Sequence, residues 1–299
     1  MAGYDQAMSR WEFYTEAAAF LRAASGYLAR DPVVNSVIAT IAERASAHGR
    51  PVFDGLYWFA VLREADAVAS VAMRTAPAPP HPLFVLPMDG DEARGLAQIL
   101  HRRGEQVGGV NGALPAAEVL AQESARLQEQ ASQQSMHSRL FRLDDLIWPR
   151  PVSGRLRPAG AGDLDLALSW SASFEREAEE QAGRTPGHTS RVNADVDAVR
   201  RRIETGGLWF WEDDGGVVVH MTGARPPSFG AARIAPVYTP PEHRGRGWAS
   251  AAVAEVTDGI QRVGAIPCLF TDQANPVSNA IYQALGYRPV LDMASVVVH

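Results

Sequence analysis

The sequence predicts a mixed α/β fold in two domains, and three observations support this. The chain has 299 residues, which exceeds the usual size of one hydrophobic core. Each half reads as helices, three strands, a helix, a strand, a helix and a strand. Turn-forming residues gather between the halves, at Pro149, Pro151, Gly154 and Pro158. We therefore expect domains over residues 1–150 and 151–299, each with a mixed sheet.

In the first half, Ser9 and Glu12 have the spacing of a capping box, and apolar residues then recur at helical intervals. This predicts a helix over 10–29. A second helix begins at Asp31-Pro32 and ends at Gly49. Strands are expected over 56–62, 67–74 and 82–87, a helix over 91–103, a strand over 107–111, a helix over 115–128 and a strand over 138–146. The Gln- and Ser-rich residues 128–138 are expected to be exposed.

The second half contains a hairpin signal, an Asp-Asp-Gly-Gly turn between apolar runs at 208–212 and 217–222. A short strand at Leu156 and helices over 163–181 and 193–204 precede it. A strand over 232–239, a helix over 249–263, a strand over 266–271, a helix over 276–285 and a strand over 293–298 follow it.

Composition excludes several classes of function. All 28 basic residues are arginine. A chain without lysine has neither a Walker-type phosphate loop nor a Schiff-base nucleophile. The net charge of −6 disfavours binding to nucleic acid.

The single cysteine, Cys268, excludes an internal disulfide and a multi-thiolate zinc site. No metal site is expected. The sequence has no apolar stretch of the length that a membrane span requires, and its first residues do not resemble a signal segment. We expect a cytoplasmic protein with neither a membrane nor a nucleic acid as partner.

The segment at 237–249, VYTPPEHRGRGWA, is the most informative in the chain. A strand runs into two prolines, then Arg-Gly-Arg-Gly, then an Ala-rich helix. Glycines permit a tight turn in which amide groups converge, and the helix adds the positive end of its dipole. Together with Arg244 and Arg246, this predicts a site for a diphosphate-like anion.

The bare pattern R-x-x-G-x-[GA] is weak, because a second copy begins at Arg157. Context distinguishes the two. The Arg157 copy follows only a short strand and precedes a polar loop, whereas the Arg244 copy lies between a strand and a long helix.

A second segment at 275–287, NPVSNAIYQALGY, accompanies the Arg244 copy. Asn275 is a good N-cap, with Pro276 in the first turn. Asn279 and Tyr282 are three residues apart and share one side of the predicted helix.

With both segments at this spacing, the chain resembles the GNAT N-acetyltransferase superfamily, closely over residues 232–290 and by element order over 151–299. The resemblance implies a sheet splayed open between its fourth and fifth strands, with acetyl-CoA or another acyl-CoA in the splay. It implies that the pantetheine arm pairs with Val237, Tyr238 and Thr239. It places the pyrophosphate on the amides of Arg244, Gly245, Arg246, Gly247, Trp248 and Ala249.

The family's mechanism is direct attack of an amine on the thioester. Tyr282 occupies the family's usual general-acid position, from which it would protonate the leaving thiolate. Asn275 and Asn279 either bond the cofactor or only cap and solubilise their helix. A backbone amide near residues 237–239 would polarise the thioester carbonyl.

The general base is less clear, because the strand over 232–239 has no carboxylate where many family members carry a Glu. Glu242 is expected to face solvent. His220 is the candidate on the third strand, against the alternative that it is a solvated strand histidine. The acidic run Glu175, Glu177, Glu179 and Glu180 either attracts a cationic amine or, as we favour, is a solvated helix face.

The equivalent turn in the first half, residues 86–95, lacks the Arg-Gly-Arg-Gly set. It carries Asp89, Asp91 and Glu92, which would repel a pyrophosphate. The first half is therefore interpreted as a degenerate GNAT-like copy that does not bind CoA in the usual way.

The sequence thus predicts an acyl-CoA-dependent N-acyltransferase that acetylates an amine-bearing small molecule or a protein amine. The alternative is a non-catalytic acyl-CoA-binding sensor. A dinucleotide-binding fold is disfavoured, because the turn lacks G-x-G-x-x-G. The sequence leaves the acceptor and the oligomeric state open.

Overall fold

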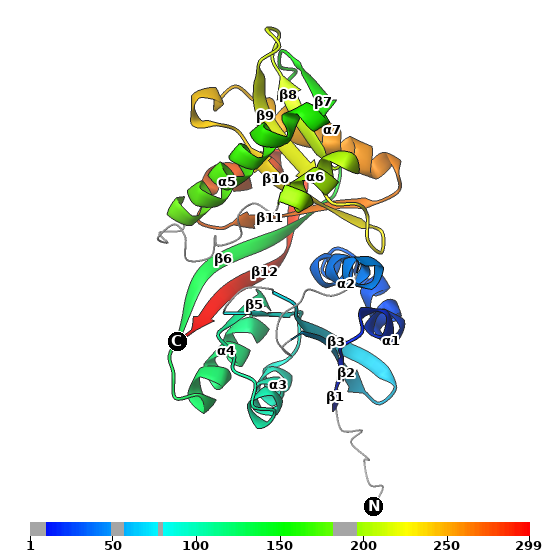
Figure 1. The fold of residues 1–299 in the computed structure, drawn as a ribbon, viewed down its shortest axis with the longest axis vertical. Coiled ribbons are helices and arrows are strands. Elements are labelled where there is room, and N and C mark those ends of the chain that lie inside the picture. The colour runs from blue at the N-terminus through cyan, green and yellow to red at the C-terminus, as the bar shows by residue number, and fades with distance from the viewer. Residues whose placement is uncertain (1–9, 49–56, 77–79, 182–195) are drawn as a thin grey trace, which may run out of the picture. The chain divides into compact units, whose positions relative to one another are not determined.

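The computed structural model describes residues 10–48, 57–76, 80–181 and 196–299. It has the mixed α/β fold expected from the sequence, with helices packed on mixed sheets (Figure 1). The chain forms two compact units. The first comprises Met1–Ser138 together with Leu291–His299, and the second comprises Arg139–Val290.

This division differs from the predicted domains 1–150 and 151–299, because two long strands each contribute to both units. These are β6 (Ser132–Leu143) and β12 (Tyr287–Val298). In the first unit, Ala131 and His299 exchange two backbone hydrogen bonds of 2.8 and 3.0 Å. In the second, the amide of Asp144 donates to the carbonyl of Gly286 at 3.1 Å. Pro149, Pro151 and Gly154 lie within the second unit, and Pro158 is the last residue of its strand β7 (Arg155–Pro158).

The sheet of the first unit has the strand order β1-β2-β3-β4-β5-β12-β6. The C-terminal strand is therefore inserted between two strands of the first half, and Met293–Val297 pairs antiparallel with β5. The other elements are β1 (Arg10–Tyr14), α1 (Ala17–Arg30), α2 (Ser36–His48), β2 (Trp58–Glu64), β3 (Ala67–Arg74), β4 (Leu83–Val85), α3 (Gly90–Arg102), β5 (Gly109–Ala113) and α4 (Ala116–Leu127).

The helix predicted over 10–29 is wrong in its first five residues, which form β1. This strand pairs antiparallel with β2 from Arg10↔Arg63 to Tyr14↔Phe59. Trp11 and Phe13 alternate with Glu12 and pack against the core of the unit. Glu12 accepts a hydrogen bond from Arg63 at 2.9 Å instead of closing a helix cap. Period-two alternation and pairing with β2 outweigh the helical spacing.

The expectation that residues 128–138 are exposed is also wrong in part, because residues 135–138 are half-buried in β6, which begins at Ser132. Ser135 donates a hydrogen bond to the carbonyl of Ser295 at 3.2 Å. A polar strand of this kind has no apolar alternation for sequence analysis to find. It forms because a distant strand supplies its partner.

The second unit has the strand order β12-β6-β11-β10-β9-β8-β7. Its remaining elements are β7 (Arg155–Pro158), α5 (Leu164–Gln181), α6 (Val196–Glu204), β8 (Leu208–Glu212), β9 (Val218–Ala224), β10 (Ala231–Tyr238), α7 (Trp248–Arg262), β11 (Ile266–Asp272) and α8 (Pro276–Ala284). These agree closely with the expected elements, including the hairpin of β8 and β9.

Helices cover both faces of this sheet (Figure 1). On one face, Phe210 and Tyr238 pack with Trp170 of α5. On the other, Ile234 of β10 packs with Val253 of α7. Ile234 and Tyr238 are four residues apart, and a register shift in β10 between Ile234 and Val237 turns them to opposite faces.

Strands β10 and β11 pair in parallel only at their beginnings, from Ala231↔Ile266 to Arg233↔Cys268. Beyond Arg233 the described chain gives β10 no partner on this side. On its other side, the pairing of β10 with β9 shifts register between Ile234 and Val237. Pro236 lies inside this bulge, where a residue without an amide hydrogen is tolerated. The splay implied by the resemblance is therefore present between the fourth and fifth strands of the unit.

Candidate active site

The turn that follows the unpaired end of β10 is exposed and shaped by glycine. After Thr239 and Pro240, a short 3₁₀ turn spans Pro241–His243. Gly245 and Gly247 then adopt left-handed backbone angles, with φ of 77° and 83°. Residues 244–247 are all exposed to solvent. The corner is open to a ligand from solvent.

The N-terminus of α7 has no side-chain cap. Its N-cap is Gly247, and the first backbone hydrogen bond into the helix runs from Ala251 to Gly247 at 3.1 Å. Within the described chain, the amides of residues 245–249 donate no hydrogen bond. Such amides, aligned with the positive end of the helix dipole, form an anion site. The residues present therefore fit the diphosphate that the sequence predicted here.

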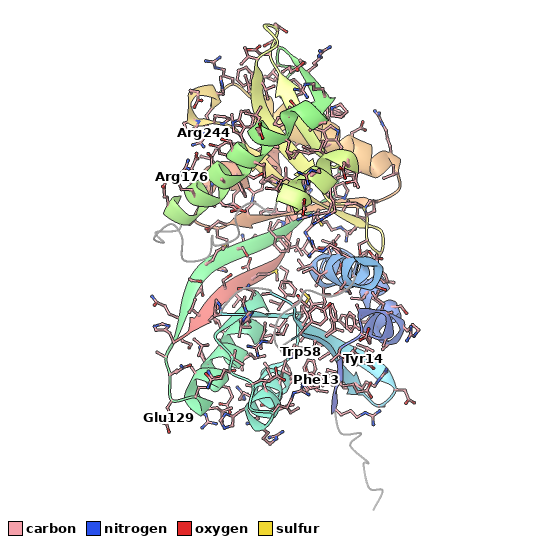
Figure 2. The ribbon with its side chains drawn as sticks, viewed as in Figure 1. Phe13, Tyr14, Trp58, Glu129, Arg176 and Arg244 are labelled. Atoms are coloured by element: carbon pink, nitrogen blue, oxygen red, sulfur yellow. The ribbon has the colours of Figure 1, made fainter. Side chains whose placement is uncertain are left out.

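The two arginines of the turn have different surroundings. Arg244 donates from Nε to the carbonyl of Thr239 at 2.9 Å, and its Nη2 pairs with Glu177 of α5. Figure 2 shows Arg244 beside this helix. Arg246 is exposed and lies over the ring of Trp248, 5.2 Å from its centroid. Arg244 thus shapes the turn, and Arg246 presents its charge at the surface.

Glu177 is not part of a solvated helix face, so the interpretation that we favoured for the acidic run is wrong for this residue. Its carboxylate pairs with Arg244 and accepts a hydrogen bond from the hydroxyl of Tyr238 at 2.8 Å. Burial opposes ionisation of the carboxyl, but the bonds from Arg244 and Tyr238 outweigh it and lower the pKa of Glu177. Glu175 and Glu180 are exposed, as expected. Adjacent glutamates in one run gave no sequence signal for which of them faces inward.

Tyr282 is buried in the core that α7, α8 and β10 share. It packs edge-to-face on Tyr287 with 6.1 Å between ring centroids. Val237, at the unpaired end of β10, packs against the same cluster. Burial raises the pKa of the Tyr282 phenol. Its hydroxyl therefore remains protonated at neutral pH, as a proton donor requires.

His220 is wholly buried, so the alternative of a solvated strand histidine is wrong. Its Nδ1 lies 2.7 Å from the hydroxyl of Thr239, and its Nε2 lies 2.6 Å from that of Thr222. Burial lowers the pKa of His220 to about 3, so the ring is neutral. With both nitrogens held by threonines, the geometry does not support the predicted catalytic role. His220 instead fixes Thr239, where β10 ends and the turn begins.

The two asparagines of α8 make bonds within the chain. Asn275 caps the helix by accepting from the amide of Ser278 at 3.0 Å. The side-chain oxygen of Asn279 accepts from Thr271 at 2.5 Å, and its nitrogen donates to the carbonyl of Asp272 at 3.1 Å. These contacts match the capping alternative for Asn275, and Asn279 fastens α8 to the end of β11.

The second copy of the anion pattern is occupied by protein. Arg157 pairs with Asp163 at 2.7 Å and donates to Glu212. Glu242 is exposed in the turn, as expected. The structure thus separates the two copies in the way that their sequence context predicted.

The equivalent helix of the first unit, α3, is closed by its own carboxylates. Asp89 accepts from the amide of Glu92 at 2.8 Å, and Glu92 accepts from the amide of Asp89 at 2.8 Å. This capping box uses donors that an anion would need, and it adds two negative charges. The predicted loss of ordinary CoA binding in the first half has a structural basis here.

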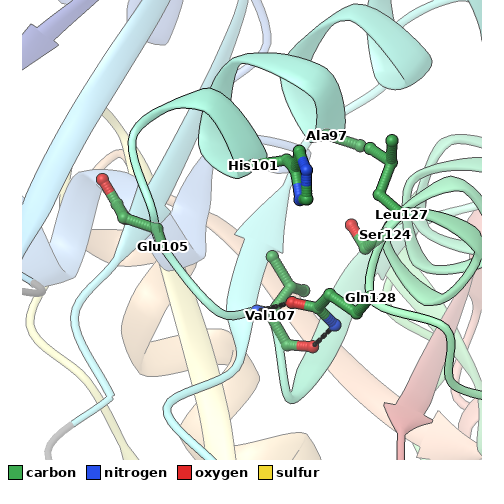
Figure 3. Close-up of a pocket in the computed structure, with 7 residues that line it drawn as sticks. All are labelled: Ala97, His101, Glu105, Val107, Ser124, Leu127 and Gln128. Atoms are coloured by element: carbon green, nitrogen blue, oxygen red, sulfur yellow. Dashed lines mark hydrogen bonds between the residues drawn. The ribbon is translucent and has the colours of Figure 1, made fainter.

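The first unit has a shallow depression between α3 and α4 (Figure 3). Gln128 spans one side of it, accepting from the amide of Val107 at 2.7 Å and donating to its carbonyl at 3.0 Å. The depression has no room for a water molecule, so it is not a ligand site.

The described ranges contain no group of three His, Cys, Asp or Glu side chains placed to hold a metal ion. No helix among them is long and apolar enough to cross a membrane.

Comparisons with known proteins centre on the same region. The family model described as FR47-like protein matches residues 225–296, which include the splay, the glycine turn and α8. No curated protein matches the chain by sequence.

Solved structures match over the whole chain. A GNAT-family acetyltransferase from Colwellia psychrerythraea has 11% identity and a TM-score of 0.54, covering 97% of this chain and 98% of that one. A GCN5-related N-acetyltransferase from Sphaerobacter thermophilus has 18% identity and a TM-score of 0.56, covering 96% and 94%. A Drosophila protein has 12% identity and a TM-score of 0.65, covering 97% and 98%. At these identities the likeness is one of fold.

Proposed function

We propose that this chain, which has the GNAT acetyltransferase fold in a tandem arrangement, is an acyl-CoA-dependent N-acyltransferase. The acyl donor is acetyl-CoA, and the acceptor is an amine. The fold predicted from the sequence is confirmed, and the chain forms two compact units. The reaction is the inference.

One observation carries the proposal, the contrast between two helix N-termini. The amides of residues 245–249 point from an uncapped helix into an open turn. The matching helix α3 is capped by Asp89 and Glu92. Only the former offers donors and cationic side chains to a diphosphate.

The residues around the splay would divide the reaction between them. The turn amides bind the diphosphate, and the unpaired backbone of β10 at Val237 to Thr239 pairs with the pantetheine arm. An amide of this strand polarises the thioester carbonyl. The buried, protonated Tyr282 gives a proton to the leaving sulfur. Acyl-CoA brings an activated acyl group, so no covalent enzyme intermediate is required.

Release of free thiol from acetyl-CoA, measured over a panel of primary amines, tests the proposal. We expect amine-dependent turnover that falls at least tenfold in Tyr282→Phe while acetyl-CoA affinity is retained. Tyr287→Phe is the matched control, because the Tyr287 hydroxyl bonds Thr257 at 2.6 Å inside the core.

The sensor alternative has one feature in its favour, the absence of a carboxylate on β10. Tight binding of acetyl-CoA with no thiol release across the amine panel would support a sensor and contradict the transferase.

A further inference from the structure

We propose that Glu177 of α5 takes the proton from the acceptor amine. It would act as the general base, a role that no residue of β10 can fill because this strand has no carboxylate. This inference rests on the proposed function and names its general base. It also defines the acceptor side of the site as the face of β10 that α5 covers.

Glu177 is placed at the end of β10 by two contacts. One carboxylate oxygen accepts from the hydroxyl of Tyr238 at 2.8 Å, and the other pairs with Arg244 of the glycine turn. The Glu177 side chain is 19% exposed, so a ligand can reach a carboxylate that is otherwise enclosed.

The carboxylate and the proposed acid lie on opposite sides of the same strand end. Tyr238 belongs to the core beneath α5, whereas the next residue back, Val237, packs on the cluster that contains Tyr282. Direct transfer needs this separation, because the amine must approach the acyl carbon on one side while sulfur leaves on another. Within the acidic run, Glu177 bonds both β10, through Tyr238, and the glycine turn, through Arg244.

Arg244 couples this carboxylate to the anion site. Its side chain is 45% exposed and lies at the corner where phosphate oxygens would bind. When Arg244 turns to a phosphate, Glu177 loses its strongest cationic partner and becomes a better proton acceptor. The remaining groups around it are Tyr238 on β10 and Arg176 on its own helix. Donor binding would therefore prepare the base for the acceptor.

The step balances without a further reactant. The acceptor ammonium gives one proton to Glu177, and the free amine attacks the thioester carbon. The C–N bond forms and the C–S bond breaks. The nitrogen loses its second proton to solvent as sulfur takes one from Tyr282. Glu177 then releases its proton to solvent and Tyr282 regains one, with a net release of one proton.

The test compares Glu177→Gln with the wild type in the full chain, by the pH profile of kcat with a primary amine and by acetyl-CoA affinity. We expect kcat at neutral pH to fall by about 10²- to 10⁴-fold, the usual contribution of a general base. The acidic limb set by the carboxylate should be lost, and the rate should instead rise with pH in proportion to the fraction of free amine. Acetyl-CoA should bind as tightly as before or more tightly, because a competitor for Arg244 is gone.

Two further variants keep the test decisive. Glu180→Gln changes an exposed glutamate of the same helix and should leave kcat and its pH profile unchanged. Glu177→Asp keeps a carboxylate and should retain part of the rate and the acidic limb.

The outcomes separate this inference from the proposed function. Amine-dependent turnover that persists at the wild-type rate in Glu177→Gln overturns the role of Glu177 as base but not the proposed transferase activity. Weaker acetyl-CoA binding with an unchanged pH profile also overturns it, since Glu177 would then only anchor the turn. A wild type that binds acetyl-CoA and releases no thiol overturns the transferase itself.

Discussion

At the scale of single residues, the sequence predicted a set of site residues but not what each side chain touches. Arg244, Gly247 and Tyr282 were predicted because their types and spacing form a pattern. The structural role of His220, which holds Thr239 in place, was missed. A strand histidine has the same sequence signature whether it is solvated or buried and hydrogen-bonded to two threonines. Glu177 was missed because helical spacing alone does not fix which of several neighbouring glutamates turns inward.

The exposed arginine of the turn should contribute to donor affinity. Arg246→Ala removes a cation that can make charge-assisted bonds to phosphate, each contributing about 1.5–3 kcal/mol. We expect acetyl-CoA affinity to fall roughly tenfold or more, measured by calorimetry. Arg262→Ala is the control, since that arginine is 77% exposed at the other end of α7 and pairs with Asp258. An equal loss in both variants would place the anion elsewhere.

The burial of His220 predicts how stability changes with pH. Its pKa is about 3 in the folded protein and about 6.5 when unfolded. Above about pH 6.5 neither state binds the proton, and the stabilisation is fully present. As pH falls further, only the unfolded chain is protonated, and stability drops by up to about 1.4 kcal/mol per pH unit.

Urea titrations between pH 7 and pH 5 test this dependence. His220→Gln should flatten the slope of unfolding free energy against pH, whereas His101→Gln, at an exposed site, should not. Identical slopes for the three proteins would show that His220 is accessible to protons in the folded state.

At the scale of elements, prediction succeeded where periodicity and end signals coincide. Helices α3, α7 and α8 lie close to their expected bounds, because each has apolar spacing and a recognisable start. Strand β1 and the first residues of β6, 132–137, were missed, because their pairing partners are distant in sequence and decide their structure. The splay could be expected only through the resemblance, since no local pattern states where two strands separate.

The glycine at the start of α7 should be irreplaceable by alanine. Gly247→Ala places a Cβ at φ 83° and 3.0 Å from Cγ1 of Val152, and left-handed backbone alone costs roughly 1–2 kcal/mol. We expect a lower melting temperature and weaker acetyl-CoA binding. Gly259→Ala, inside the same helix with nothing within 4 Å of its Cβ, should be neutral or stabilising by up to about 1 kcal/mol. Full acetyl-CoA affinity in Gly247→Ala would refute this account of the turn.

At the scale of the whole molecule, the repeated element order correctly indicated two units, but their boundary could not be read from the sequence. Turn-forming residues mark where a chain changes direction, and here they lie inside one unit. The actual division depends on the strands β6 and β12, each long enough to contribute to both units. No local sequence pattern shows that these two strands contribute to both units.

Because residues 291–299 belong to the first unit, we expect the last residues of the chain to stabilise that unit. Val296 is 5% exposed in the core of that unit, whereas Val297 is 36% exposed. Val296→Ala should destabilise by about 1–3 kcal/mol, and Val297→Ala should stay within about 0.5 kcal/mol. Hydrogen exchange should quicken in α3 and α4 but not in α7. Loss of protection confined to the second unit would contradict the division.

The central claim is that the amides of residues 245–249 hold a diphosphate. Amide-resolved hydrogen exchange, with and without acetyl-CoA, tests it most directly. The account predicts that these amides become protected on binding while those at the capped start of α3 do not change. Protection at α3, or none at the turn under saturating acetyl-CoA, would contradict it.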